Sequence, residues 1–360
     1  MAAPTISISV LEGRLDPLEK RVARTSKQVP MPSYIGVPLG PIQRAVEFWH
    51  LYRIHTRDLP GRIHALLDET RDIESRISRQ TGRPVAGLKM LEIGPGQQQL
   101  QLAYFGRNNE VVGIDLDVLL PDFSFQGCVR MLAQNGCLRT CKTIGRKLLG
   151  IDARIRAEVT SQLGLEALPK LPVLRMDAAK MQFPDDHFDV VFSKDVFEHL
   201  SDPEGTIDEI SRVLKPGGTM FVRLHLFTSD SGGHDTRIFS GRRGGLPFWA
   251  HLRPELGQQV RSNAYLNRLR LDDWFRLFES RMPGCAVVAL CNAPPTDREE
   301  LARLRLDGQL SNYSDEELLS VGVDACWRKP VSPLAAPCPG QAPAGPCSDG
   351  GSGRRRKRHG

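Results

Sequence analysis

The sequence predicts an α/β protein built on a doubly wound, mostly parallel sheet, and three observations predict it. An apolar run, Leu88 to Ile93, ends in the turn Gly94-Pro95-Gly96. A second apolar run, Val111 to Ile114, ends in Asp115, 21 positions after Gly94. Further short apolar runs alternate with segments of helical spacing, as expected when helices connect parallel strands.

The glycine turn and Asp115 have the residue types of a nucleotide-type cofactor site. Gly94 can adopt a positive φ, and Gly96 lets the backbone approach a ligand without a Cβ in the way. An acid about 20 residues on, at the tip of the second strand, is placed to accept hydrogen bonds from two ribose hydroxyls. A dinucleotide site needs a third glycine where this chain has Gln99, so nicotinamide and flavin cofactors are disfavoured. A bare strand-to-helix turn is the alternative.

Five further strands complete the expected sheet of seven. The third runs from Val173 to Ala178 and ends in an acid and a small residue, and residues 183–193 lead into the fourth. Glu198-His199 and an amphipathic segment to Leu214 follow. The remaining strands are expected at 219–225, after Lys215-Pro216-Gly217-Gly218, and at 285–291 and 321–327, with a helix at 296–305 between the last two.

In order and spacing, residues 85–225 resemble the class I S-adenosylmethionine-dependent methyltransferases, in particular the branch with the ubiquinone and menaquinone biosynthesis methyltransferases. The resemblance implies a Rossmann-like seven-stranded sheet with an antiparallel last strand at its edge. It also implies S-adenosyl-L-methionine as the cofactor. The reaction would be in-line transfer of a methyl group to an oxygen, nitrogen or carbon nucleophile, in which placement supplies much of the acceleration.

The resemblance assigns the cofactor site to Glu92, Gly94, Gly96, Asp115, Leu116, Asp177, Ala178 and Ser193. The first three would line the methionine part and Asp115 would hold the ribose. Asp177 would face the adenine amino group beside the amide of Ala178. Gln98 departs from the family, which often has a third glycine there. Either acid alone is typical of a solvated strand end or a turn, but both fall at successive strand ends, where doubly wound sheets bind ligands.

Two histidines lie near the expected carboxyl edge of the fifth strand. His225 ends that strand, and His234 lies in the polar glycine loop 228–235, so both are candidate bases or substrate clamps. We expect the acceptor to be a hydroxyl of a small molecule, a saccharide or a lipid-linked glycan. A non-catalytic methyltransferase-like binding module and a protein or RNA N-methyltransferase are the alternatives.

Asp195, Glu198 and His199 have the i, i+3, i+4 spacing that would put three potential metal ligands on one helix face. Some of the resembled methyltransferases use such a set to bind a divalent ion that lowers the pKa of the acceptor hydroxyl. His225 or His234 could complete the shell. Helix packing and hydrogen bonding are the competing interpretation, and the sequence assigns no metal.

The chain is expected to have three parts. Residues 1–84 form an extension with capping helices at 41–56 and 62–80, and residues 85–330 form the methyltransferase domain. Within that domain the core motifs span 88–225, and residues 118–171 form a long helical insertion between strands two and three. The insertion is basic and amphipathic over 128–150, which fits a lid, a surface for an anionic or lipid-linked substrate, or a helical excursion packed on its own sheet.

Composition excludes several classes of protein. No apolar run approaches the roughly 18 to 20 residues needed to span a bilayer. The first ten residues lack the pattern of a signal peptide, and the eight cysteines lack zinc spacing and are expected to be reduced thiols. We therefore expect a cytoplasmic enzyme.

The net charge of +6 is concentrated in the tail, residues 331–360. Five basic residues at 354–358 and Asp349 contribute +4, so the body carries about +2, which argues against a nucleic-acid groove across the core. The segment 331–353 is rich in Pro, Gly, Ala and Ser and is expected to be disordered. The basic end could contact anionic lipid or nucleic acid, or it could be a solvated tail with no specific partner.

Because the tail is compositionally unable to bury a core, truncation after Pro330 should leave the melting temperature and the cofactor affinity unchanged. Differential scanning calorimetry and isothermal titration of both chains test this. A melting temperature several degrees lower in the truncated chain would show that the tail is part of the folded structure.

Overall fold

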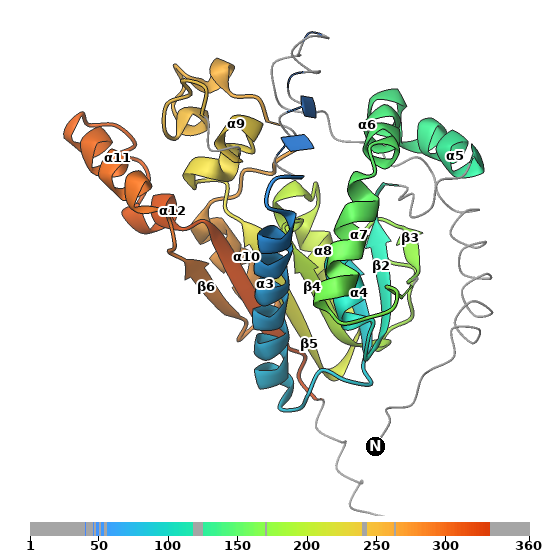
Figure 1. Ribbon diagram of the computed structural model, residues 1–360. Coiled ribbons are helices and arrows are strands. Elements are labelled where there is room, and N and C mark those ends of the chain that lie inside the picture. The colour runs from blue at the N-terminus through green and yellow to red at the C-terminus, as the bar shows by residue number, and fades with distance from the viewer. Residues whose placement is uncertain are drawn as a thin grey trace, which may run out of the picture. The chain divides into compact units, whose positions relative to one another are not determined.

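The computed structural model describes residues 40, 46, 48–49, 52–53, 56–117, 125–169, 171–239, 243–262 and 264–331. Its strands form one sheet with the order β3-β2-β1-β4-β5-β7-β6 (Figure 1). In chain order they are β1 (Lys89–Ile93), β2 (Glu110–Asp115), β3 (Val173–Arg175), β4 (Phe188–Lys194), β5 (Leu214–His225), β6 (Ala286–Leu290) and β7 (Gly322–Arg328). The first five are mutually parallel, and β7 pairs antiparallel with both β5 and β6.

The predicted seven-stranded, mostly parallel sheet with an antiparallel last strand is confirmed. Two boundaries differ from the prediction. β3 is only three residues long, and β5 begins at Leu214, so the Lys-Pro-Gly-Gly segment lies inside the strand rather than before it. The pairing of β4 with β5 shifts register between Phe188 and Val190, which accommodates this irregular start.

Helices cover both faces of the sheet, as a doubly wound fold requires. Figure 1 shows α3 (Leu59–Thr81), α4 (Leu100–Phe105) and α7 (Ile151–Gln162) in front of the strands, and α8 (Pro203–Val213) and α10 (Leu271–Arg281) behind them. Along β1, Met90 joins the core on the α3 side, while Leu91 joins the core on the α8 side. This alternation follows from the two-residue period of a strand and leaves β1 buried on both faces.

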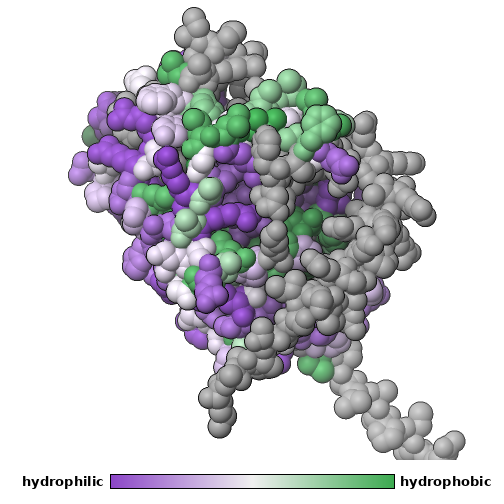
Figure 2. All heavy atoms as spheres, turned by 45° about the vertical axis from the view of Figure 1, so that its right-hand side comes forward, coloured by the Kyte–Doolittle hydropathy of each residue, from purple (hydrophilic) through white to green (hydrophobic). Residues whose placement is uncertain are grey.

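The long connection from β2 to β3 contains α5 (Phe125–Asn135), α6 (Cys137–Leu148) and α7. Ile151, Ile155 and Val159 bury α7 against α3, so the end of the insertion packs on its own sheet. On α5 and α6, by contrast, Phe125 is 83% and Leu148 75% exposed. These helices belong to the side brought forward in Figure 2. Of the basic residues predicted to line this segment, Arg146 pairs with Asp152 at 2.6 Å, and the side chains of Arg130, Arg139 and Lys142 lie outside the described structure. A lid or substrate surface stays a prediction.

The remaining elements are short. They are the helices α9 (Thr236–Phe239), α11 (Pro295–Leu306) and α12 (Asp315–Leu319) and the 3-10 turns η1 (Phe197–His199), η2 (Asp230–Gly233), η3 (Ala250–Leu252) and η4 (Gly257–Gln259). The helix predicted at 62–80 is α3, whereas the one predicted at 41–56 falls mostly outside the described residues, as does the tail from 332 onward. The six described cysteines are free. Within the described ranges, no helix is long and apolar enough to cross a membrane.

A buried ion pair joins β5 to β7. The guanidinium of Arg223 donates two hydrogen bonds of 2.7 Å to the carboxylate of Asp324, which is 3% exposed. Arg223 also reaches Asp72 on α3, at 3.0 Å. Burial alone would lower the pKa of Arg223, but these carboxylates raise it, so the charge is held. The pair thus fixes the antiparallel edge of the sheet to the helix that covers it.

Substituting Asp324→Asn should destabilise the fold by roughly 3 kcal/mol, because Arg223 would keep its charge in a buried place with a weakened partner. The matched control is Glu204→Gln, which removes a carboxylate from an exposed pair with Arg281 and should cost less than about 1 kcal/mol. Urea unfolding of the three chains measures both effects. Equal losses in the two variants would contradict the structural role of the pair.

Candidate functional site

The order of strands reverses between β1 and β4. From β1 the chain proceeds to β2 and β3 on one side, and from β4 it proceeds to β5 on the other. The loops that leave the carboxyl ends of β1 and β4 therefore diverge and open a crevice, which is where sheets of this type bind ligands. The glycine turn after β1 and residues 195–196 after β4 line this place.

Gly94 cannot be replaced by a larger residue without displacing its neighbours. Its φ is 72°, and a Cβ built on it would lie 2.4 Å from Cγ2 of Val196, across the crevice. Its amide also donates to the carbonyl of Ile114 at 2.8 Å, which holds the turn against β2. The backbone of Gln99, just before α4, is left-handed as well, with φ of 53°. The sequence alone gave no sign of this, because glycine is the usual residue in that conformation.

Glu92 contributes a buried carboxyl group to the end of β1. The residue is 2% exposed, and its Oε2 has no hydrogen-bond partner within the described structure. Burial, with a smaller contribution from the charge of Asp115, raises its pKa to about 8, while Lys194 opposes the shift. A carboxyl group in this state gains most from a positively charged ligand. Glu92 therefore fits the methionine part of a sulfonium cofactor, which carries an ammonium group.

The two acids predicted at strand ends lie on neighbouring strands. Asp115 ends β2 and accepts a hydrogen bond from the amide of Asp117 at 2.8 Å. Asp177 follows β3 and accepts one from the amide of Ala179 at 3.0 Å. Both make the short turns typical of aspartate, and neither turn uses all the acceptor capacity of its carboxylate. Leu116, which follows Asp115, is exposed, and Ala178, which follows Asp177, is buried. Contact with a cofactor stays a prediction for all four.

Ser193 has a structural partner. Its buried hydroxyl donates to the carbonyl of Ile93 at 3.0 Å and so ties β4 to β1 at the crevice. This hydrogen bond uses the hydroxyl proton of Ser193 and fixes the ends of the two strands. Contact between Ser193 and the cofactor stays a prediction.

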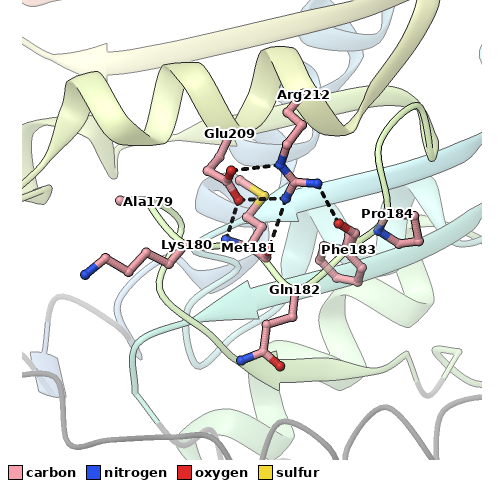
Figure 3. A pocket seen from close by; sticks show the side chains of 8 residues that line it. All are labelled: Ala179, Lys180, Met181, Gln182, Phe183, Pro184, Glu209 and Arg212. Carbon is pink, nitrogen blue, oxygen red and sulfur yellow. Dashed lines mark hydrogen bonds and ion pairs between the residues drawn. The ribbon is translucent and has the colours of Figure 1, made fainter.

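The loop after Asp177 is held by two side chains of α8, which Figure 3 shows. Arg212 donates to the carbonyls of Met181 and Phe183, and Glu209 accepts from the amide of Met181 at 2.6 Å. The cavity drawn there is lined by residues 179–184 and by these two side chains, which also pair with each other. We assign it no ligand, because Arg212 and Glu209 already pair with each other and with the loop backbone.

Beyond β4 and β5, three side chains converge. Glu198 in η1, His225 at the end of β5 and His234 after η2 each offer a ligand atom within 4.8 Å of the others. The sequence predicted that His225 or His234 could complete a metal shell with Glu198, but it placed Asp195 and His199 in that shell as well. The ring of His199 borders the group, with its centre 4.8 Å from that of His234.

The prediction that Asp195, Glu198 and His199 share one helix face is wrong. β4 ends at Lys194, Asp195 takes a left-handed φ of 55°, and the three residues of η1 form a 3-10 turn rather than an α-helix. Asp195 is exposed and pairs with Lys194 at 2.5 Å. The i, i+3, i+4 spacing therefore carries no common face here, because an α-helix begins only at Pro203.

Burial makes the two candidate histidines weak bases. Burial, together with neighbouring histidines, lowers the pKa of His225 to about 4 and that of His234 to about 2. Both imidazoles are thus neutral at physiological pH. An efficient general base has a pKa closer to the working pH, so this arrangement favours a clamp or a ligand role over the base role.

Two buried acids hold the loop that carries His234. Asp230 accepts from the amide of Trp249 at 2.7 Å and from Arg243, and Asp235 pairs with Arg237 and accepts from the amide of Arg261. Between them Gly232 passes so close to Phe227 that a Cβ would lie 2.1 Å from its carbonyl oxygen. His234 is therefore fixed by its backbone rather than by its own side chain.

Comparison with known proteins finds similarity to methyltransferases. The methyltransferase domain family matches residues 127–222, from α5 to β5. Sterol 24-C-methyltransferase from Aspergillus fumigatus is 44% identical over 59 residues, which are 16% of each chain. Phosphoethanolamine N-methyltransferase 3 from Arabidopsis thaliana is 24% identical over 165 residues, covering 43% of this chain and 26% of the relative. The chain thus spans about a quarter or less of the length of these two relatives.

Among solved structures, phosphoethanolamine N-methyltransferase 2 from Haemonchus contortus, in complex with S-adenosyl-L-methionine, is 18% identical. The aligned region covers 72% of this chain and 52% of the Haemonchus contortus chain, with a TM-score of 0.36. The fold and the matched family together confirm the resemblance predicted from the sequence. Residues 127–222 thus match the methyltransferase domain family, and the chain has the seven-stranded sheet predicted for a class I methyltransferase.

The raised pKa of Glu92 predicts a pH dependence of stability. Its pKa of about 8 in the fold exceeds the ordinary 4.5, so the stability it confers is full below about pH 4.5 and is lost as the pH rises through 8. Relative to Glu92→Gln, the native chain should lose roughly 3 to 5 kcal/mol of unfolding free energy across that interval. Denaturant unfolding at several pH values measures the difference.

The control for this measurement is Glu110→Gln, which changes an exposed carboxyl group on the neighbouring strand. Its pH profile should run parallel to the native one. If the Glu92→Gln profile also runs parallel to the native profile, the carboxyl group of Glu92 is charged in the fold and the assignment fails.

Proposed function

We propose that this chain binds S-adenosyl-L-methionine in the crevice between β1 and β4 and transfers its methyl group to an oxygen of a small molecule, a saccharide or a lipid-linked acceptor. One observation carries the proposal. The glycine turn, the unpaired buried carboxyl group of Glu92 and the two strand-end acids Asp115 and Asp177 all lie at the carboxyl edge around one topological switch point.

Each of the three acids binds a different part of the cofactor. Glu92 faces the positively charged methionine part, which would lower the pKa of its carboxyl group and offset the cost of its burial. Asp115 accepts hydrogen bonds from the ribose hydroxyls, and Asp177 accepts one from the adenine amino group. The side chain of Val196 occupies the place that a Cβ of residue 94 would need, so the turn requires glycine at this position.

The chemistry needs little from the protein besides placement. The acceptor hydroxyl releases its proton to solvent, and its oxygen forms the new bond to the methyl carbon. At the same time the carbon–sulfur bond breaks, and its electron pair goes to the sulfur, which becomes a neutral thioether. Holding the acceptor oxygen about 3 to 3.5 Å from the methyl carbon and in line with that bond supplies much of the rate.

The class of acceptor rests on two further points. The two curated relatives named above are a sterol and a phosphoethanolamine methyltransferase, so their names indicate small-molecule or lipid-related acceptors and do not share an acceptor atom. The body of this chain carries a net charge of about +2, too little for a nucleic-acid groove. An oxygen acceptor is favoured because neutral imidazoles and a buried carboxyl group gather beyond β5, where they suit a hydroxyl.

Calorimetric titration tests the cofactor assignment. Asp115→Ala should weaken the binding of S-adenosyl-L-methionine by about 1.5 to 3 kcal/mol, because the ribose hydroxyls lose a charged acceptor. Asp115→Asn should fall between, since it keeps an oxygen for the amide of Asp117. Glu166→Ala, an exposed acid in the loop before β3, is the charge-matched control. Unchanged affinity in Asp115→Ala, or binding of NAD by the native chain, would reject the assignment.

Methyl transfer itself is tested with S-adenosyl-L-methionine labelled in the methyl group and fractionated cell extract. Label should enter a small-molecule or lipid fraction with the native chain, and at least tenfold more slowly with Asp115→Ala at subsaturating cofactor. Label in protein or RNA would establish one of the alternative acceptors. Tight cofactor binding without label in any fraction would make the chain a methyltransferase-like binding module.

A further inference from the structure

We propose that Glu198, His225 and His234 form a binding site for a divalent transition-metal ion, with zinc or iron(II) as the chemical type. One atom of each side chain lies within 4.8 Å of the others. The three residues come from different parts of the fold, since Glu198 is in η1, His225 ends β5 and His234 follows η2. A site assembled from three elements requires each of these elements to be held in place.

The strongest evidence is that the polar atoms of this cluster lack partners. Glu198 is 2% exposed, and neither of its carboxylate oxygens has a hydrogen-bond partner within the described structure. His234 is 8% exposed, and its Nε2 is also buried without a partner there. Leaving such groups unsatisfied costs about 1 to 3 kcal/mol each, and more for a charged group. A cation between them would satisfy all three atoms at once.

The surrounding contacts orient the ligands as metal sites require. His225 Nε2 lies 2.8 Å from Ser231 Oγ, so one ring nitrogen is engaged by a hydroxyl and the ring cannot turn freely. The backbone amide of His234 donates a hydrogen bond to the carbonyl of Ser231 at 3.0 Å, and the next residue, Asp235, pairs with Arg237. These contacts fix the backbone of His234. Hydrogen bonds of this kind hold metal-bound imidazoles in a single orientation.

The ligand set selects the kind of metal. Two neutral imidazoles and one carboxylate suit zinc and iron(II), whereas magnesium and calcium prefer oxygen ligands alone. Around zinc, ligand atoms at about 2.0 to 2.2 Å from the metal are about 3 to 3.5 Å apart. Small rotations of the side chains from the present separations would close the site. Three protein ligands leave at least one position open for another molecule.

That open position gives the ion a role, and this step rests on the proposed function. η1 follows β4, which borders the switch point, and η2 follows β5, the next strand in the sheet. An acceptor hydroxyl bound to the ion would have a lowered pKa and would release its proton to solvent more readily.

Metal binding is measured on the full chain after treatment with a chelator. Cys137→Ser and Cys141→Ser are introduced first, because their sulfurs lie 3.9 Å apart and would hold zinc themselves. Zinc titration with elemental analysis should then give one ion per chain and a higher melting temperature. Cobalt(II) bound in place of zinc should give visible absorption bands from nitrogen and oxygen ligation.

Variants locate the site. Glu198→Gln and His234→Gln, which preserve much of each side chain's size, should each weaken zinc binding at least tenfold and change the cobalt spectrum. His64→Gln, which alters an exposed histidine paired with Asp68, should change neither. Circular dichroism of each variant checks that it folds.

Zinc binding by the native chain tests the metal site even if a variant does not fold. Failure of the chelated chain to take up zinc, or full-strength binding in a folded Glu198→Gln chain, would overturn the metal site. Calorimetry with S-adenosyl-L-methionine in the presence of chelator is a separate measurement. Cofactor binding without zinc binding rejects only the metal site, and zinc binding without cofactor binding rejects only the proposed function.

Discussion

The reversal of strand order between β1 and β4 is the constraint on which the proposed site depends. Two neighbouring parallel strands whose connections leave in opposite directions necessarily separate their carboxyl-terminal loops. The side chains at this point serve that arrangement. Ser193 bonds β4 to β1, and Gly94 lets the turn pass against Val196. The helices on the two faces then bury both strands.

Buried acids in this fold fall into two groups, and the difference separates support from function. Asp324, Asp230 and Asp235 each face an arginine at 2.7 Å or less, so their charges are compensated and they hold neighbouring elements together. Glu92 and Glu198 are as deeply buried but have oxygens without hydrogen-bond partners. Because such groups lower the stability of an empty fold, their presence at the crevice is best explained by positively charged ligands.

The fold could be predicted because its signals are local. Apolar runs, the glycine turn and the acids at strand ends all lie within short segments, so the sheet and the places of Asp115 and Asp177 followed from the sequence. Glu198, His225 and His234 come together through loops, and no periodicity relates positions that distant in the chain. The error over Asp195 has the same origin. A spacing implies a common face only if the segment is helical, and the left-handed turn at Asp195 prevents that.

The position of β7 in the sheet affects how the chain folds during its synthesis. β7 lies between β5 and β6 and pairs with both, although Arg223 and its partner Asp324 are 101 residues apart in sequence. While the protein emerges from the ribosome, β5 keeps a bare edge beside Met220, Phe221 and Val222 until residue 328 has been added. Apolar strand edges of this kind associate readily with other chains. Pairing of β7 is therefore the step that covers this apolar edge of β5 in the nascent chain.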